Sequence, residues 1–68
     1  MSKITINLNG KTIQANTAEL LDLLSTEAPN DRPFAVEING IIVPSSDYKD
    51  FKVKDNDQIE IIAAVGGG

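Results

Sequence analysis

The first part of the chain alternates between polar and apolar side chains. Residues 3–8 alternate strictly, which is the two-residue period of a half-buried strand. The pair Asn9-Gly10 that follows tolerates the positive φ angles of a type I′ turn. Residues 11–15 then have the composition of a returning strand. The pattern therefore predicts that the chain opens with a β-hairpin.

The pattern changes to a helical one after residue 15. The apolar stripe consists of four leucines: Leu20, Leu21, Leu23 and Leu24. Asn16 or Thr17 can cap the start of this helix with a side-chain oxygen, and Glu19 suits the positive end of the helix dipole. Pro29 disfavours helical geometry in the residue before it, so the helix should end near residue 28. We expect this helix to pack its leucines on the sheet.

A second hairpin is predicted after this helix. Residues 34–38 alternate again, Asn39-Gly40 repeats the turn signal, and residues 41–43 form a short strand before Pro44. The pattern therefore predicts a second hairpin that ends at Pro44.

After Pro44 the chain has a mainly polar segment, which is followed by a mainly apolar one. Residues 45–54 are polar and aperiodic, and we expect an irregular segment attached to the core by Tyr48, Phe51 and Val53. Residues 55–57 should form a turn, in which Asn56 tolerates left-handed geometry. Residues 58–64 then alternate as a last strand.

This order of elements predicts an α+β fold. A mixed sheet of four to five strands should be covered by one main helix. The first and last strands are the most apolar, so we place them side by side at the centre of the sheet, which is the β-grasp, or ubiquitin-like, arrangement. We expect one domain over residues 1–65 and a flexible glycine tail over residues 66–68.

Composition excludes several classes of function. The 68 residues include no Cys and no His. The chain therefore offers no thiol nucleophile, and it lacks the imidazole side chain that usually transfers protons near neutral pH. A net charge of -4 repels the phosphate backbone of nucleic acids. No apolar run is long enough for a signal peptide or a membrane helix. We expect a cytoplasmic protein with no catalytic residue, metal site or bound cofactor of its own.

The three glycines at positions 66–68 carry the candidate chemistry. Terminal glycines alone are typical of a flexible end, but here they follow an apolar strand that should be fixed in the sheet. Without Cβ atoms, Gly66 and Gly67 can thread a narrow channel of a partner. The carboxylate of Gly68 would then be coupled to AMP, and a sulfur nucleophile would displace AMP to leave a thiocarboxylate. Such a chain would be a carrier and not an enzyme.

Several segments together resemble the ThiS family of sulfur carriers in thiamine biosynthesis. They are residues 39–44, residues 54–61 and the end Val65-Gly66-Gly67-Gly68. The resemblance covers essentially the whole chain, although Ser45 replaces a residue that is often basic in the family. It implies an adenylating enzyme of the ubiquitin-activating type (ThiF-like) that uses ATP, a persulfide sulfur donor, and a thiazole synthase (ThiG-like) that consumes the thiocarboxylate.

Other functions remain open at this stage. The small subunit of molybdopterin synthase shares the fold and the activation chemistry, although its members tend to carry a proline where this chain has Ala63-Ala64-Val65. A ubiquitin-like modifier would use the same activated carboxylate against lysines, and a pure scaffold would not need the glycines. A metal-binding alternative would use four acidic residues, Asp47, Asp50, Asp55 and Asp57, as oxygen ligands.

A docking surface for the partners is expected on the last strand. Ile62 and Ala64 should lie on the exposed side of that strand, next to the tail. The alternative is that Ile62 is simply buried in the core.

Overall fold

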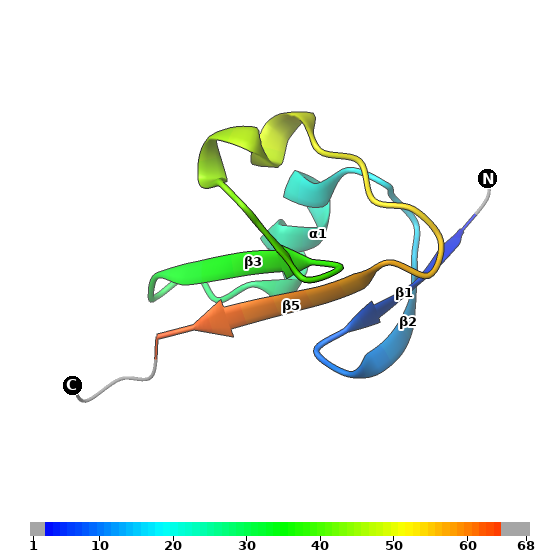
Figure 1. Ribbon diagram of the computed structural model, residues 1–68, viewed down its shortest axis with the longest axis horizontal. Helices are drawn as coiled ribbons and strands as arrows, with labels where there is room; N and C mark the ends of the chain where they lie inside the picture. The colour runs from blue at the N-terminus through cyan, green and yellow to red at the C-terminus, as the bar shows by residue number, and fades with distance from the viewer. Residues whose placement is uncertain (1–2, 65–68) are drawn as a thin grey trace.

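The computed structural model of the protein describes residues 3–64. The elements in chain order are β1 (Ile4–Leu8), β2 (Lys11–Ala15), α1 (Leu20–Glu27), β3 (Phe34–Ile38), β4 (Ile41–Val43), the 3₁₀-helix η1 (Ser45–Asp50) and β5 (Gln58–Ala63). The strands form one five-stranded sheet in the order β2-β1-β5-β3-β4. Figure 1 shows α1 and η1 on one side of this sheet.

Both predicted hairpins are present with the predicted turns. β1 pairs antiparallel with β2, and β3 pairs antiparallel with β4. The φ angles are 50° at Asn9, 83° at Gly10, 53° at Asn39 and 84° at Gly40, as a type I′ turn requires at both central residues. Asn and Gly occupy these positions because most other residues are strained there.

The first and last strands lie side by side in the middle of the sheet, as predicted. β5 runs parallel to β1 and antiparallel to β3, so the sheet is mixed. The largest fully buried side chains come from three of these strands and from the helix: Ile6, Leu20, Val36 and Ile59. The core therefore lies between α1 and the central strands, which is the β-grasp fold.

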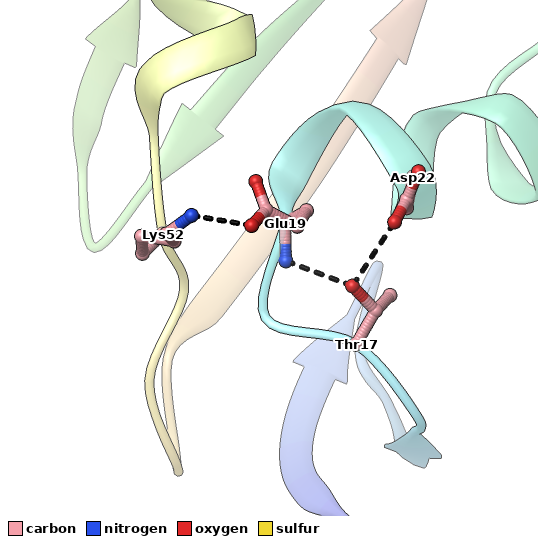
Figure 2. A network of polar contacts seen from close by, with 4 residues as sticks. All are labelled: Thr17, Glu19, Asp22 and Lys52. Carbon is pink, nitrogen blue, oxygen red and sulfur yellow. Dashed lines mark hydrogen bonds and ion pairs between the residues drawn. The ribbon is translucent and has the colours of Figure 1, made fainter.

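The start of α1 differs from the prediction. The helix begins at Leu20, and the N-cap position is Glu19, whose side chain makes no capping hydrogen bond. The Thr17 hydroxyl instead accepts a hydrogen bond from the Glu19 N–H at 3.0 Å and donates one to Asp22 at 3.2 Å. Figure 2 shows this network, in which Glu19 also forms an ion pair with Lys52. Thr17 thus orders the residues before the helix and does not occupy the cap position.

The delayed helix start has a tertiary cause. The Leu20 N–H donates to the Phe51 carbonyl at 3.1 Å, and the Val53 N–H donates to the Ala18 carbonyl at 2.8 Å. Glu19 and Lys52 form an isolated antiparallel bridge between these two bonds. The backbone before Leu20 is therefore held in an extended conformation, which is incompatible with an earlier helical turn.

The segment after β4 is more regular than predicted. Residues Ser45–Asp50 form a 3₁₀-helix, which the aperiodic sequence did not indicate. The expected attachments are present, because Val53 is buried and Tyr48 and Phe51 pack against the core. The Tyr48 ring also stacks on Phe34, with 6.3 Å between ring centroids and 7° between ring planes. Within residues 3–64, no helix is long and apolar enough to cross a membrane.

Candidate functional site

The strand that leads to the glycines is fixed on both sides. β5 pairs with β3 from Ile38↔Ile59 to Phe34↔Ala63, and with β1 at two positions near its start. The Ala64 N–H then donates to the Pro33 carbonyl at 3.0 Å. The chain is therefore hydrogen-bonded to the sheet up to the last described residue.

Two turn asparagines also hold β5 with their side chains. Asn39 accepts a hydrogen bond from the Gln58 N–H at 2.9 Å and donates one to the Asp57 carboxylate at 3.0 Å. Asn9 accepts one from the Ile61 N–H at 2.8 Å, where β1 has already ended. The sequence marks these residues only as turn formers, so it gave no signal of this second role.

Alternate residues of β5 face opposite sides of the sheet. Ile59 points into the core and is 2% exposed, whereas Ile62 is 51% exposed. Ala64, the last described residue, is exposed as well. Ile62 is therefore not a core residue, and the alternative of a buried Ile62 is wrong. Exposure meets the first requirement of a docking residue but does not by itself identify a partner.

Four further residues lie on the same face as Ile62. Ala35 is directly opposite Ile62 in the β3·β5 register, and Glu37 is directly opposite Glu60. On the other side of β3, Ile42 is opposite Glu37 and is 56% exposed. Our sequence analysis missed this grouping. The hairpin turn at residues 39–40 already indicated the pairing of Glu37 with Ile42, but the register of β3 on β5 required the structure.

The predicted sulfur-carrying residue lies outside the described residues. This applies to Gly68, to Gly66 and Gly67, and to Val65 at the predicted end of the domain. The structure describes the chain that leads to them as far as Ala64, just after the end of β5.

One ion pair lies in the loop beside the end of β5. The Arg32 guanidinium donates hydrogen bonds to both carboxylate oxygens of Asp31, each at 3.2 Å. These bonds hold the pKa of Asp31 below its ordinary value. Pro33, which accepts the hydrogen bond from Ala64, is the next residue, so this charged pair directly precedes the residue to which the end of the described chain is bonded.

The metal-binding alternative finds no support in the geometry. Asp55 accepts a hydrogen bond from the Thr5 N–H at 2.8 Å, and Asp57 accepts one from the Lys54 N–H at 2.8 Å. Both carboxylates therefore serve to order the turn before β5. In the described part of the chain, no three acidic residues come together in a way that could hold a metal ion.

A groove with a volume of 410 Å³ lies between β2 and α1. Its walls are formed by residues 13–17 and by residues 22, 23 and 25–27. Seven of its ten lining residues have hydroxyl, amide or acidic side chains, and β2 lies two strands away from β5. The groove is therefore separate from the base of the tail.

Comparisons with known proteins agree on one family. The sequence pattern of the ThiS family matches residues 3–68. The chain is similar to a solved structure, the thiamine biosynthesis protein ThiS from Geobacter metallireducens, with a TM-score of 0.75 and 30% identity. The similarity covers 96% of this chain and 100% of that one.

Relatives were also found by sequence, and two of them differ in how much of their length this chain matches. A thiazole synthase from Paramagnetospirillum magneticum is 40% identical over 67 residues, which is 97% of this chain but only 20% of that protein. The uncharacterized protein ycf40 of Pyropia yezoensis is 32% identical over 68 residues, which is 98% of this chain and 96% of that protein. Because the family pattern covers nearly the whole chain and the fold agrees with a solved member, the protein belongs to the ThiS family.

Proposed function

We propose that the protein is a sulfur carrier of thiamine biosynthesis, and that Gly68 is the residue that carries the sulfur. Family membership and the likeness to a ThiS structure support this role. The observation that carries the proposal is that the glycines begin only three residues after β5 ends at Ala63, and that the chain is hydrogen-bonded to the sheet up to Ala64. A fixed strand followed by residues without Cβ atoms suits delivery of a chain end into a narrow active site.

The chemistry would take place entirely on the main chain. The Gly68 carboxylate would attack the α-phosphorus of ATP, releasing pyrophosphate and leaving a mixed anhydride with AMP. A persulfide on a donor protein would then attack the acyl carbon, and AMP would leave. A thiol would cleave the resulting acyl disulfide, which leaves the thiocarboxylate on Gly68 and a disulfide on the thiol side. No side chain of this protein takes part, in line with the absence of Cys and His.

The partners follow from this scheme. ATP would be bound by an adenylating enzyme of the ubiquitin-activating, ThiF-like type, and not by this protein. A ThiG-like thiazole synthase would consume the thiocarboxylate. The likeness between this chain and a fifth of a relative named thiazole synthase supports this pairing, because it places a segment of this kind in the same polypeptide as that enzyme.

Ile62 and Ala64 are proposed as part of the surface that meets these partners. Both are exposed and lie at the end of β5, on the face of the sheet opposite the core. A partner that encloses the glycines must come close to these two side chains, because only Val65 separates Ala64 from the first glycine. The cytoplasmic location that the scheme assumes stays a prediction.

Intact mass spectrometry tests the proposal. The protein is incubated with the adenylating enzyme from the same organism, ATP and a persulfide donor, and the mass of the whole chain is measured. We expect an increase equal to the replacement of one oxygen by sulfur. A matched variant that lacks Gly67 and Gly68 should show no increase, because its chain end no longer reaches the nucleotide. An unchanged mass with an enzyme that is active on another carrier would refute the proposal.

An assay with the protein that has acquired sulfur then distinguishes the related functions. Thiazole formation with the thiazole synthase is the expected result. Sulfur transfer to a molybdopterin precursor would instead identify the molybdopterin synthase alternative, and covalent attachment to lysines of other proteins would identify a ubiquitin-like modifier.

A further inference from the structure

The face of the sheet opposite α1 has an uneven distribution of charge. Strand alternation and the register place the following residues on it: Thr5, Asn7, Thr12, Gln14, Ala35, Glu37, Ile42, Gln58, Glu60 and Ile62. The β2 and β1 half is polar and uncharged, whereas the β5, β3 and β4 half carries two glutamates and two isoleucines. None of these positions is occupied by Lys or Arg.

The two glutamates oppose each other directly. Glu37 and Glu60 are partners in the antiparallel register of β3 and β5, so their Cβ atoms are about 4.5–5.5 Å apart. Like charges in directly opposite positions destabilise a sheet. In the described part of the chain, the ion pairs are Asp31 with Arg32 and Glu19 with Lys52. Neither pair relieves the repulsion between Glu37 and Glu60.

Exposed apolar side chains flank the pair of glutamates. Ile42 lies beside Glu37 on β4 and is 56% exposed, and Ile62 follows Glu60 by two residues on β5 and is 51% exposed. These are two of the four large hydrophobic residues that are exposed within residues 3–64. Two carboxylates that form no ion pair within residues 3–64, and that lie between two exposed isoleucines, are complementary to a cation surrounded by apolar side chains.

We propose that the protein which receives the tail places an arginine between Glu37 and Glu60 and packs apolar side chains on Ile42 and Ile62. This inference rests on the proposed function, because it describes the partner of the same strand. Arginine fits better than lysine, since its planar guanidinium has five N–H donors and can bond two carboxylates at once. The partner would thereby remove the repulsion that the free protein retains.

Binding measurements with neutral variants test this inference. Glu37→Gln, Glu60→Gln and the double variant are compared with the wild type for binding to the adenylating enzyme and to the thiazole synthase, at low and at high salt. Glu27→Gln is the matched control, because Glu27 is exposed at the end of α1 and not on this face. We expect the double variant to bind at least one of the two enzymes about tenfold more weakly. The dependence of its Kd on salt should also be smaller than in the wild type.

Thermal unfolding separates this effect from a folding defect. Removing the repulsion should leave Tm unchanged or raise it by about 1–5 °C, even though binding is weaker. Unchanged affinity of the double variant for both enzymes would overturn the inference. Weaker binding with an unchanged salt dependence would also overturn it, because the contact would then not be electrostatic. A wild-type protein that acquires sulfur while the double variant binds normally would refute this inference and leave the proposed function intact.

Discussion

The side chain of Asn39 should contribute measurably to the stability of β5. It makes two hydrogen bonds, to the Gln58 N–H at 2.9 Å and to Asp57 at 3.0 Å. Replacement by glycine keeps the positive φ of 53° accessible and removes only these bonds. At about 0.5–1.5 kcal/mol for each bond, the loss is about 1–3 kcal/mol. The greater freedom of glycine in the unfolded chain adds about 0.5 kcal/mol.

This loss is large for a chain of 68 residues. The free energy of unfolding of such a domain is expected to be about 3–10 kcal/mol, and each kcal/mol corresponds to about 4–8 °C in Tm. Asn39→Gly should therefore lower Tm by at least about 6 °C. The amide of Gln58 should also exchange with solvent faster, because its acceptor is lost.

The assay is urea unfolding together with native-state hydrogen exchange. Asn30→Gly serves as the control, because Asn30 is an exposed loop residue and its side chain makes none of the hydrogen bonds found within residues 3–64. The same change in unfolded-state freedom occurs in both variants, so their difference isolates the two hydrogen bonds. If both variants unfold with free energies that agree within about 0.3 kcal/mol, the asparagine does not stabilise β5.

Further substitutions test the core, the exposed face and the loop. Leu20→Ala should destabilise the fold by about 2–5 kcal/mol, because Leu20 is fully buried, whereas Leu21→Ala, at a half-exposed position, should change stability by no more than about 0.5 kcal/mol in urea unfolding. Ile62→Asp should weaken binding to the adenylating enzyme while circular dichroism shows a folded domain, and its global unfolding would contradict the exposed position. Arg32→Gln should raise the pKa of Asp31 in an NMR titration, because the hydrogen bonds that favour the ionised carboxylate are lost. Since that pKa is lowered in the folded protein, any stabilisation by this pair is present at neutral pH and disappears as the pH falls through the lowered pKa. An NMR titration of Asp31 that the substitution leaves unchanged would show that Arg32 does not cause the lowered pKa.

The sequence by itself determined both hairpins and the type of each main element. Asn9-Gly10 and Asn39-Gly40 specify type I′ turns through local sterics, and the alternation beside them specifies which side chains face the core. The apolar character of the first and last strands was sufficient to place them at the centre of the sheet. The family resemblance was also visible at this level, because its segments are continuous in the chain.

The tertiary structure alone decided the start of the helix, the 3₁₀-helix and the grouping of side chains on the exposed face. Leu20 is the first helical residue because the backbone around Glu19 pairs with Lys52, which is 33 residues away in the chain. Glu37 faces Glu60 because β3 and β5, which are distant in sequence, have one fixed register. Such features depend on contacts between separate segments, and a local pattern of hydrophobic and polar residues contains no information about which segments meet or in which register.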